Sequence, residues 1–455
     1  MYRYIQTTIK FIMEKIKFYL RWWFDYELPF YVEREFDSSI VNTNLIAVLV
    51  GARRSGKSTL FYQLINSYKK KIPVSNIIYI NFEDDRLAPL EGKELSVLLN
   101  IFRQNYRYDE NYPIYLFLDE IQNLPGWEKT VRRLYDTEKV KIFITGSNSK
   151  LLSREISTAL RGRTLSSKVN PLSFTEYLKF NNIPVPDLND LRYSEQKDKI
   201  IFLFDKYLRY GGFPEVVLAE NEHLRDRILQ EYMNTIFYSD IIERYEIRQF
   251  KVMDIYLKML CRQTGSLFSF GKMQNLLKSL GFKVSKNTLI EYLSYMEKAF
   301  FGKSIMIFSY SIKDQLQYPR KFYLLDNGLF TATTFIKEGD YGRLLENLVF
   351  NTLHKSYDNI AYWKDIRGFE VDFVLPDLLH APNAFPLIQV CFNMRDEKTR
   401  KREIDNLIAA AKHFNVKTGL IITRDSWDEI FINGIKIIEK PYFSWCSRVK
   451  DWKGN

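Results

Sequence analysis

The chain is poor in the residues that build disulfide frameworks and metal sites. It has 3 Cys and 4 His among 455 residues, and these are scattered along the sequence. Such spacing excludes a disulfide-stapled fold and a zinc site of the usual Cys/His type. No apolar run approaches the roughly 18 residues of a membrane-spanning helix. We therefore expect a soluble protein of a reducing, cytoplasmic compartment, without a transmembrane segment.

The N-terminus also lacks the uncharged central segment of a signal peptide. Apolar residues recur there at helical spacing, with Lys10, Lys15, Lys17 and Arg21 between them. The pattern predicts a basic amphipathic helix within residues 1–30. Such a helix could lie on a membrane surface. Packing on the body of the protein or on another subunit is the favoured interpretation.

Acidic residues are fewer than basic ones. Lys and Arg number 66 and Asp and Glu 55, which gives a formal net charge of +11. A basic balance is typical of proteins that bind a polyanion, such as nucleic acid or an anionic membrane. An AT-rich genome or a hot habitat would raise the Lys content as well, and we weigh the two explanations equally. The length suffices for about three domains.

The most specific pattern is a glycine-rich stretch after an apolar run. Residues 45–50 predict a buried strand that leads into G-A-R-R-S-G-K-S-T, after which apolar residues return at helical spacing. The glycines allow a tight loop whose N–H groups converge on phosphate oxygens at a helix N-terminus. In this motif Lys57 reaches the β- and γ-phosphates and Ser58 ligates Mg²⁺. The predicted nucleotide site comprises Gly51, Ala52, Arg53, Arg54, Ser55, Gly56, Lys57, Ser58 and Thr59.

Two acids follow another apolar run in the same half of the chain. P-I-Y-L-F-L-D-E ends in Asp119 and Glu120, and the carboxyl end of a parallel strand would lie beside the phosphate loop. Asp119 is expected to hold Mg²⁺ through a water, as the partner of Ser58. Glu120 is expected to polarise the attacking water as a general base. Further strands over residues 76–82 and 141–145, alternating with helices, predict a parallel sheet covered on both faces.

Four further side chains are candidates for catalysis. Ser147 or Asn148, which follow the fourth strand, would sense the γ-phosphate or orient the water. Capping of the next helix is the alternative. Arg161 and Arg163 in L-R-G-R-T are candidates for the arginine, supplied by a neighbouring subunit, that neutralises charge on the transferring phosphoryl group. A plain surface pair explains the two arginines at least as well.

Five motifs follow the phosphate loop in order: F-E-D-D-R-L, L-D-E-I-Q-N-L-P-G-W-E, I-T-G-S-N, L-R-G-R-T and Y-G-G-F-P-E-V-V. Together they resemble a prokaryotic, largely archaeal and bacterial, family of AAA+-like P-loop ATPases. Members carry a C-terminal domain of unknown function that is similar to restriction-endonuclease folds. The resemblance covers nearly the whole chain after about residue 30. It implies an α/β fold with an AAA+-like parallel sheet, the phosphate-loop strand near the centre of that sheet, and ATP as the nucleotide.

The middle of the chain predicts helices followed by a small mixed unit. Residues 171–250 are mostly helical in pattern and would form a lid over the nucleotide. Three helices and two strand-like runs over residues 251–330 predict a winged-helix domain, which serves either to read DNA or to dock a protein. In a DNA reader the residues facing the nucleic acid would be Lys286, Asn287, Glu291, Lys313 and Arg320.

The last segment, residues 331–455, resembles the restriction-endonuclease core in the order of its elements. In active relatives a helical Glu, an Asp and a second acid bind divalent metal, and a Lys two residues beyond that acid polarises water. Glu346 and Asp372 match this pattern, whereas Gln389 replaces the second acid and Cys391 replaces the Lys. A neutral amide is a poor ligand for hard cations, and a Cys carries no fixed positive charge. We therefore expect a catalytically degenerate nuclease-like domain that still binds DNA or protein.

These patterns lead to three hypotheses. The favoured one is an ATPase that uses ATP and Mg²⁺ to move its winged-helix and nuclease-like domains on DNA. The second is a nucleotide-gated switch or scaffold that binds a protein partner or associates with itself. The third is an ATP-dependent metal nuclease. The expected domains are an amphipathic helix (1–30), an ATPase core (31–170), a helical lid (171–250), a winged helix (251–330) and a nuclease-like domain (331–455).

Overall fold

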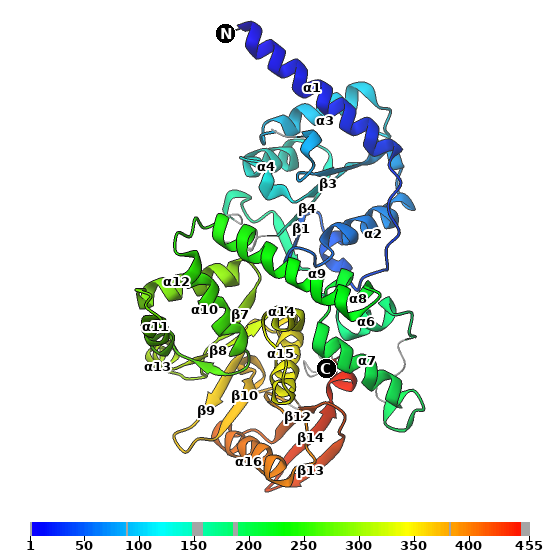
Figure 1. Cartoon of the computed structure of the whole chain (residues 1–455). Coiled ribbons are helices and arrows are strands. Elements are labelled where there is room, and N and C mark those ends of the chain that lie inside the picture. The colour runs from blue at the N-terminus through cyan, green and yellow to red at the C-terminus, as the bar shows by residue number, and fades with distance from the viewer. Residues whose placement is uncertain (1, 88–89, 148–157, 185–189, 382–383, 447–455) are drawn as a thin grey trace. The chain divides into compact units, whose positions relative to one another are not determined.

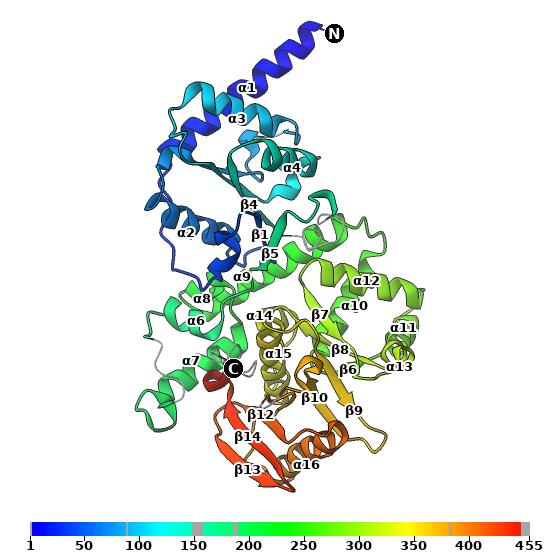
Figure 2. The same ribbon diagram turned by 180° about the vertical axis from the view of Figure 1, so that it is seen from behind.

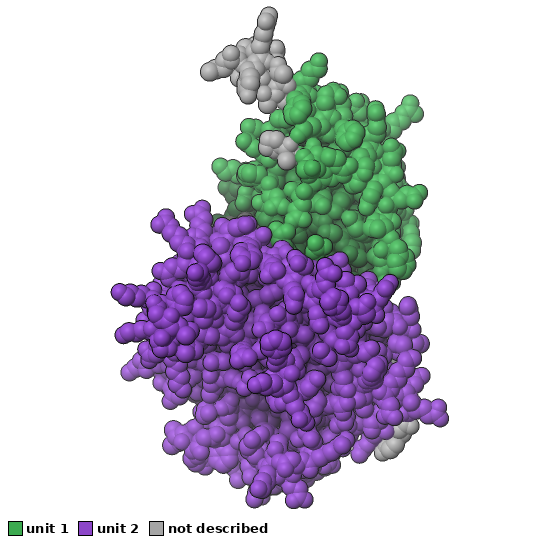
Figure 3. Space-filling model, viewed as in Figure 1, with its two compact units in different colours: residues 1–170 green, residues 171–455 purple. Residues whose placement is uncertain are grey.

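The chain forms two compact units, Met1–Asn170 and Pro171–Asn455, which have different colours in Figure 3. The structure is a computed structural model, and it describes residues 2–87, 90–147, 158–184, 190–381 and 384–446. Among these residues, no helix combines the length and the apolar character that crossing a membrane requires.

Unit 1 is built on a five-stranded sheet (Figure 1). Its strands are β1 (Ile46–Val50), β2 (Ile77–Asn81), β3 (Ile114–Asp119), β4 (Val140–Gly146) and β5 (Thr164–Lys168). The strand order is β2-β3-β4-β1-β5, and every neighbouring pair is parallel. The strand that precedes the phosphate loop, β1, is therefore an inner strand, and all its residues are buried.

The apolar runs predicted four of these strands, and the structure confirms them. The fifth strand, β5, has the sequence T-L-S-S-K, which contains a single apolar residue. It pairs with β1 along its whole length, from Ile46 opposite Thr164 to Val50 opposite Lys168. This strand is at the edge of the sheet and is only partly buried, so it needs no apolar run.

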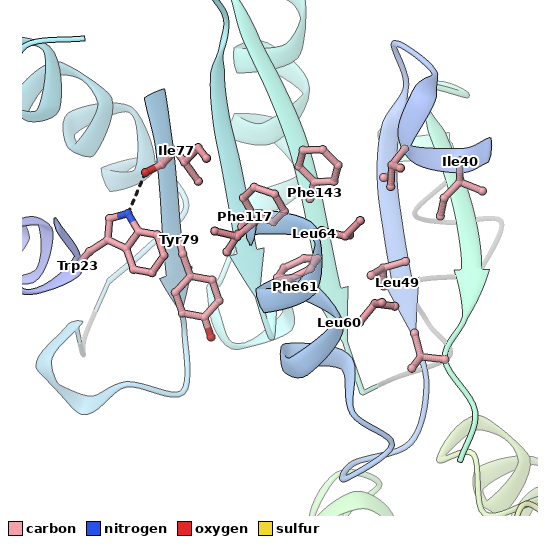
Figure 4. Packing of buried hydrophobic residues seen from close by; sticks show 14 residues of the cluster. Trp23, Ile40, Leu49, Leu60, Phe61, Leu64, Ile77, Tyr79, Phe117 and Phe143 are labelled. Carbon is pink, nitrogen blue, oxygen red and sulfur yellow. Dashed lines mark hydrogen bonds between the residues drawn. The ribbon is translucent and has the colours of Figure 1, made fainter. Parts of the chain in front are cut away.

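The helices of unit 1 include the predicted amphipathic N-terminal helix. They are α1 (Tyr2–Asp25), α2 (Lys57–Lys69), α3 (Glu94–Asn105) and α4 (Trp127–Thr137), with the short 3-10 helices η1 (Ser38–Asn42), η2 (Val74–Asn76), η3 (Asp85–Leu87) and η4 (Ile121–Asn123). Ile16, Tyr19 and Trp23 of α1 are buried, and Trp23 Nε1 donates a hydrogen bond to the Ile77 carbonyl at 2.8 Å (Figure 4). The second half of α1 thus packs on unit 1 itself.

Aromatic side chains fix the helix that follows the phosphate loop. Phe61 of α2 contacts Phe117 of β3 edge-on, with ring centroids 5.2 Å apart. Phe117 in turn stacks on Phe143 of β4 at 4.4 Å, and Figure 4 shows the three rings together beside Leu64. Burial of such large apolar side chains stabilises the unit. It also fixes the N-terminus of α2 near the carboxyl ends of the strands.

Unit 2 is rich in helices. They are α6 (Phe174–Phe180), α7 (Lys197–Tyr210), α8 (Pro214–Leu218), α9 (Glu222–Thr235), the π-helix η7 (Ile236–Glu243), α10 (Phe250–Arg262), α11 (Phe270–Ser279), α12 (Lys286–Lys298), α13 (Ile312–Gln317), α14 (Asn327–Thr333), α15 (Tyr341–His354), α16 (Glu397–Phe414) and α17 (Tyr442–Trp445), with the 3-10 helices η6 (Asp190–Tyr193), η8 (Glu338–Asp340) and η9 (Pro376–Leu378). The helical pattern predicted for residues 171–250 is confirmed.

Two sheets complete unit 2 (Figure 2). The first consists of β6 (Leu267–Phe268), β7 (Gly302–Ile305) and β8 (Arg320–Leu324), antiparallel in the order β6-β8-β7. The second consists of β9 (Ala361–Lys364), β10 (Glu370–Val374), β11 (Leu387–Val390), β12 (Thr418–Thr423), β13 (Asp428–Ile432) and β14 (Ile435–Pro441). Its order is β13-β14-β12-β11-β10-β9, and it mixes parallel and antiparallel pairs.

Two details differ from the expected pattern of these sheets. The strand expected over residues 303–310 is shorter, because regular pairing ends at Ile305. The loop expected before β8 contains the helix α13. By contrast, the turn expected near Gly368 lies between β9 and β10, and this glycine has a φ of +98°. A glycine adopts that left-handed conformation without strain.

The G-G-F-P-E stretch contains the turn between α7 and α8, as predicted, and its last two residues begin α8. Asp326 holds this turn, because its carboxylate accepts hydrogen bonds from the backbone N–H of Gly212 at 2.7 Å and of Gly328 at 2.8 Å. A Cβ atom on Gly211 would lie 1.7 Å from Asp326 Oδ1. The motif therefore ties the helices after residue 171 to the segment that follows β8.

Candidate functional site

The glycine loop between β1 and α2 lies against neighbouring backbone. The N–H of Gly51 donates to the Gly146 carbonyl at 3.3 Å, and a Cβ on Gly51 would lie 2.1 Å from the Val169 carbonyl oxygen. Gly56 and Arg54 both have left-handed φ angles, +93° and +63°. Glycine is thus required at both ends of the loop. At Gly51 a side chain would collide with the Val169 carbonyl, and at Gly56 the backbone is left-handed.

Lys57 begins α2 and is only 4% exposed. Its ammonium donates to the carbonyls of Gly51 at 3.2 Å and Ala52 at 3.0 Å. It also pairs with Glu120 Oε1 at 3.1 Å. No described side chain caps the N-terminus of this helix, so the N–H groups of its first turn can bind an anion.

An arginine of the lead-in segment supports the loop. Arg34 is buried, and its guanidinium donates to the Ser55 carbonyl at 2.7 Å and to the Asn170 carbonyl at 2.9 Å. Its backbone N–H donates to Gln63 of α2 at 2.8 Å. The sequence predicted no role for Arg34, because nothing in the local pattern reveals a contact with a loop residue 21 positions away.

Asp119 ends β3 and is fully buried. Its Oδ2 accepts a hydrogen bond from the Tyr79 hydroxyl at 2.8 Å, and its Oδ1 accepts one from the Thr145 hydroxyl. Ser58 also hydrogen-bonds this carboxylate. Burial raises the pKa of Asp119 above its ordinary value, against the opposing effect of the three hydroxyl groups. The structure thus brings Ser58 and Asp119 together, as the sequence placed them.

Glu120 follows with a left-handed backbone, at a φ of +50°. Its Oε1 faces Lys57, and its Oε2 accepts hydrogen bonds from the Gln122 amide at 2.5 Å and from the Ser147 N–H at 3.1 Å. Burial raises the pKa of Glu120, but the Lys57 ammonium and the Gln122 amide outweigh this effect and hold it below its ordinary value. The carboxylate is therefore ionised at neutral pH, as a base must be.

Gln122 is a functional candidate that the sequence interpretation missed. Its amide lies between the carboxylate of Glu120 and the hydroxyl of Ser147, 3.3 Å from the latter. It connects the acid at the end of β3 to the end of β4. The motif L-D-E-I-Q contains the residue, but its role depends on η4, which turns the side chain back toward Glu120.

The remaining predicted site residues are less closely joined to this cluster. Arg163 pairs with Asp136 at 2.7 Å on the surface of unit 1. Arg161 is exposed and has a left-handed φ of +50°. In the phosphate loop, Arg53 pairs with Glu83 at 2.8 Å. Asn148 lies outside the described residues.

The donor set at the end of β3 fits Mg²⁺. A buried carboxylate and a serine hydroxyl are hard oxygen ligands, and Mg²⁺ in nucleotide sites takes few protein ligands beside water and phosphate. No group of three or more His, Cys, Asp and Glu side chains suited to a metal ion occurs among the described residues. Ser58 and Asp119 therefore suit an ion shared with a nucleotide rather than one held by protein alone.

The expected degenerate nuclease site lies in unit 2. Asp372 of β10 accepts a hydrogen bond from the Val390 N–H at 3.0 Å. Gln389 accepts one from the Asp372 N–H at 3.3 Å and donates to Glu403 of α16 at 2.6 Å. Burial raises the pKa of Cys391 to about 12. The Cys391 thiol is therefore neutral, in line with the expectation that it supplies no positive charge.

A lysine from another strand lies in this acidic cluster. Lys321 of β8 is 2% exposed, and its ammonium is 2.8 Å from Asp372 Oδ1, 3.0 Å from Glu370 Oε1 and 3.2 Å from Glu346 Oε1. Burial lowers the pKa of Lys321, but the carboxylates outweigh it and hold the pKa well above its ordinary value. The sequence interpretation assigned roles to Arg320 and Glu346 and missed Lys321 between them.

Comparisons with known proteins bear on both units. A family model described as an AAA domain matches residues 43–178, and one described as a domain of unknown function matches residues 201–340. The chain is 36% identical over 427 residues to Uncharacterized protein MJ1544 of Methanocaldococcus jannaschii, across 91% of this chain and 90% of that protein. It is 30% identical over 399 residues to an uncharacterized protein of Haemophilus influenzae, across 87% of this chain and 93% of that protein.

Among solved structures, the Walker-type ATPase PABY2304 of Pyrococcus abyssi aligns with a TM-score of 0.44 and 16% identity, over 68% of this chain and 99% of that one. The AAA-domain match includes the phosphate loop and both acids at the end of β3. The two relatives align with nearly the full length of the chain. The chain belongs to one family with these archaeal and bacterial proteins, and its first unit contains an AAA domain.

Proposed function

We propose that the chain hydrolyses ATP at the site formed by the phosphate loop, Asp119 and Glu120. The observation that carries this proposal is the convergence of Lys57, Asp119 and Glu120 in one buried site. The site offers an ammonium for phosphate oxygens, a carboxylate for a metal ion and an ionised carboxylate for a water. Transfer of a phosphoryl group to water needs these three groups.

Binding of the triphosphate would change the partners of Lys57. The ammonium and the loop N–H groups donate to the β- and γ-phosphate oxygens, so Lys57 exchanges Glu120 for phosphate. Glu120 is then held by Gln122 and by the N–H of Ser147. Its freed Oε1 accepts a proton from the water that attacks the γ-phosphorus. Ser58 and Asp119 would hold Mg²⁺, whose charge neutralises the phosphate oxygens.

Of the two candidate arginines, Arg161 suits a neighbouring copy of the chain better. Its side chain is exposed, and no ion pair of Arg161 occurs among the described residues. Arg163 is held by Asp136 on its own unit. An arginine that enters a neighbour's site must be free to leave its own surface, because its charge is needed only in the transition state. This assignment makes self-association part of the proposed function.

DNA is the partner that we propose for the segment around α11 and α12. The order of α10, α11, α12 and the three-stranded sheet supports the winged-helix interpretation, and such domains place the third helix in the major groove. The third helix, α12, also carries an acidic side chain: Glu291 is exposed and accepts a hydrogen bond from the Tyr295 hydroxyl. The exposed basic side chains around these helices include Lys272, Lys278, Lys283, Lys286, Lys298 and Lys313. Lysines at this density favour contact with phosphates.

The ATPase proposal is tested by phosphate release from the full chain with ATP and MgCl₂. Lys57→Ala is expected to reduce turnover to background. Glu120→Gln is expected to retain ATP and to lose turnover by about 100-fold or more, because a general base contributes that much. Lys70→Ala, at the exposed C-terminal end of α2, is the matched control and is expected to behave as wild type. Unchanged turnover in Lys57→Ala would contradict the proposal.

The DNA proposal has its own test. Turnover and fluorescence anisotropy are measured with duplex DNA at two salt concentrations, for wild type and for the double variant Lys283→Glu/Lys286→Glu. The variant is expected to weaken DNA binding at low salt and to reduce its salt dependence, because two phosphate contacts are lost. Turnover without DNA is expected to stay the same. Equal binding by both proteins would contradict DNA contact at α12.

One observation favours a second function, a nucleotide-gated switch or scaffold that binds a protein. Lys57 and Glu120 form an ion pair in this structure. Glu120 can therefore act as a base only after a phosphate has separated it from Lys57. A chain that works in this way would retain ATP, turn over very slowly and gain nothing from DNA. The same assays separate the two functions.

A further inference from the structure

The acidic cluster of unit 2 is built around one ammonium. Glu346 comes from α15, Glu370 and Asp372 come from β10, and Lys321 comes from β8. The three carboxylates lie 2.8–3.2 Å from Lys321 Nζ. Figures 1 and 2 both show β8 beside β10 and α15. A compact cation surrounded by carboxylates from separate elements is the arrangement in which a divalent ion is usually held.

Other groups of the cluster are arranged around the same lysine. The Tyr323 hydroxyl donates to Glu346 Oε1 at 2.7 Å. Lys364 pairs with Glu370 Oε2 at 2.9 Å. Burial and the nearby Asp372 raise the pKa of Glu346 to about 8. The ammonium groups of Lys321 and Lys364 thus offset most of the negative charge of the three carboxylates before any metal arrives.

The two sheets of unit 2 are also joined by backbone contacts next to this lysine. Phe308 N–H donates to the Tyr362 carbonyl at 2.6 Å, and Tyr362 N–H donates to the Met306 carbonyl at 3.2 Å. The Tyr362 hydroxyl donates to the Pro319 carbonyl at 2.5 Å. The two ends of the β7–β8 connection thus attach to the edge strand β9. Lys321 supplies the buried charge of the same junction.

We propose that Lys321 takes the place of a divalent cation in the Glu346–Glu370–Asp372 cluster and thereby locks the three-stranded sheet to the six-stranded sheet. With the lysine in place, the cluster is not among the described groups suited to a metal ion, and it binds the chain's own lysine instead. Movement between the segments 251–330 and 331–455 is blocked while the lysine is in place. This proposal is independent of ATP hydrolysis, since every residue in it belongs to unit 2.

The proposal is tested on the full chain without nucleotide, by thermal unfolding and by manganese binding measured by electron paramagnetic resonance. Lys321→Met keeps most of the length of the side chain and removes its charge. It is expected to lower the unfolding temperature by roughly 6–15 °C, because it leaves buried carboxylates without their cation. It is also expected to bind one more Mn²⁺ per chain than wild type, with partial recovery of the unfolding temperature in MnCl₂.

Two further variants provide controls. Lys321→Met/Asp372→Asn is expected to lose the additional Mn²⁺, which places the ion in this cluster. Lys321→Met/Glu346→Gln/Asp372→Asn carries nearly neutral groups of the same shape and is expected to unfold within a few degrees of wild type. If Lys321→Met does not fold and this triple variant does, the result supports the proposal.

Three results would overturn the proposal. The first is binding of Mn²⁺ by the wild-type chain that Asp372→Asn abolishes, since the lysine would then yield to metal. The second is an unchanged unfolding temperature in Lys321→Met. The third is failure of the triple variant to fold, since Lys321 would then do more than balance the carboxylates.

Discussion

The two units each contain a buried lysine, and the two lysines differ in their partners. Lys57 is 4% exposed and Lys321 is 2% exposed. Lys57 faces one carboxylate and two carbonyl oxygens, whereas Lys321 faces three carboxylates. Burial alone therefore does not distinguish a lysine that binds a ligand from one that holds the fold. The two lysines differ instead in the number of carboxylates around the ammonium.

The surroundings of the two ammonium groups also distinguish a lysine that can bind a ligand from one that holds the fold. Lys57 lies at the N-terminus of α2, where unpaired N–H groups favour an incoming anion. Its carboxylate partner, Glu120, has two other donors and can release the lysine. Around Lys321, negative charge is already in excess, so another anion would be repelled. One lysine is therefore available to a phosphate, and the other is fully engaged by its own chain.

The largest effect is expected when each lysine is replaced by methionine in turn. Lys57→Met is expected to reduce ATP turnover by about 100-fold or more, with little change in the unfolding temperature of the nucleotide-free chain. Lys321→Met is expected to do the reverse, with a loss of about 3–5 kcal/mol in the free energy of unfolding and ATP binding retained. Calorimetric unfolding and ATP titration of both variants measure the contrast. Equal loss of ATP binding in both variants would contradict it.

The next effect concerns the expected nuclease pattern. Gln389→Glu would supply the missing second acid, but the new carboxylate would lie where the amide now donates to Glu403 at 2.6 Å. We expect a loss of about 1–3 kcal/mol in unfolding free energy, because a buried hydrogen bond is replaced by repulsion. Urea unfolding measures the change. The exchanged pair Gln389→Glu/Glu403→Gln is the control, and it is expected to recover most of the stability.

A smaller effect is expected for Gln122, which holds the partner of Lys57. Gln122→Leu removes a hydrogen bond to the Glu120 carboxylate, so we expect turnover to fall about tenfold. Because Gln122 lowers the pKa of Glu120, its loss should raise that pKa and move the acidic limb of the kcat profile to higher pH. Asn123→Ala, at an exposed neighbour, is the control. A fall in turnover with an unmoved profile would argue against a positioning role.

The smallest effect is expected for the pH dependence of unit 2. The pKa of Glu346 is raised to about 8 in the folded chain, so folding takes up a proton between pH 4.5 and 8. This contribution to stability is complete below the unfolded pKa and is lost as the pH rises through 8. Glu346→Gln removes the dependence. Its unfolding temperature should therefore rise relative to wild type by about 2–4 °C from pH 5 to pH 6, and a constant difference would contradict this origin.

The two lysines also differ in how well the sequence predicts their surroundings. The motif around Lys57 is local: strand, loop and helix follow one another within about 25 residues. The acids of β3 were found because parallel strands end at one edge of a sheet. Lys321 and Asp372 are 51 residues apart and lie in different sheets. No periodicity links them, so only the folded chain could bring them together.

Other misses have a similar physical origin. The edge strand β5 has little apolar character, because one side of it is open, and its pairing with β1 is a tertiary effect. Arg34 acts through the backbone carbonyl of Ser55 in the phosphate loop, and a carbonyl leaves no signal in the sequence. Gln122 belongs to the motif L-D-E-I-Q, yet its contact with Glu120 depends on a short 3-10 helix. Patterns thus located the strands and the loop better than the side chains that support them.

The order of the strands in unit 1 has a consequence for the synthesis of the chain. The buried strand β1 pairs only with β4 and β5, and these begin roughly 90 and 114 residues after β1 ends. At ribosomal rates of about 5–20 residues per second, the strand waits roughly 5–20 s for its neighbours. During that time the segment I-A-V-L-V has both edges unpaired. The nascent chain therefore exposes an apolar, aggregation-prone segment, which chaperones can bind, before the phosphate loop can form.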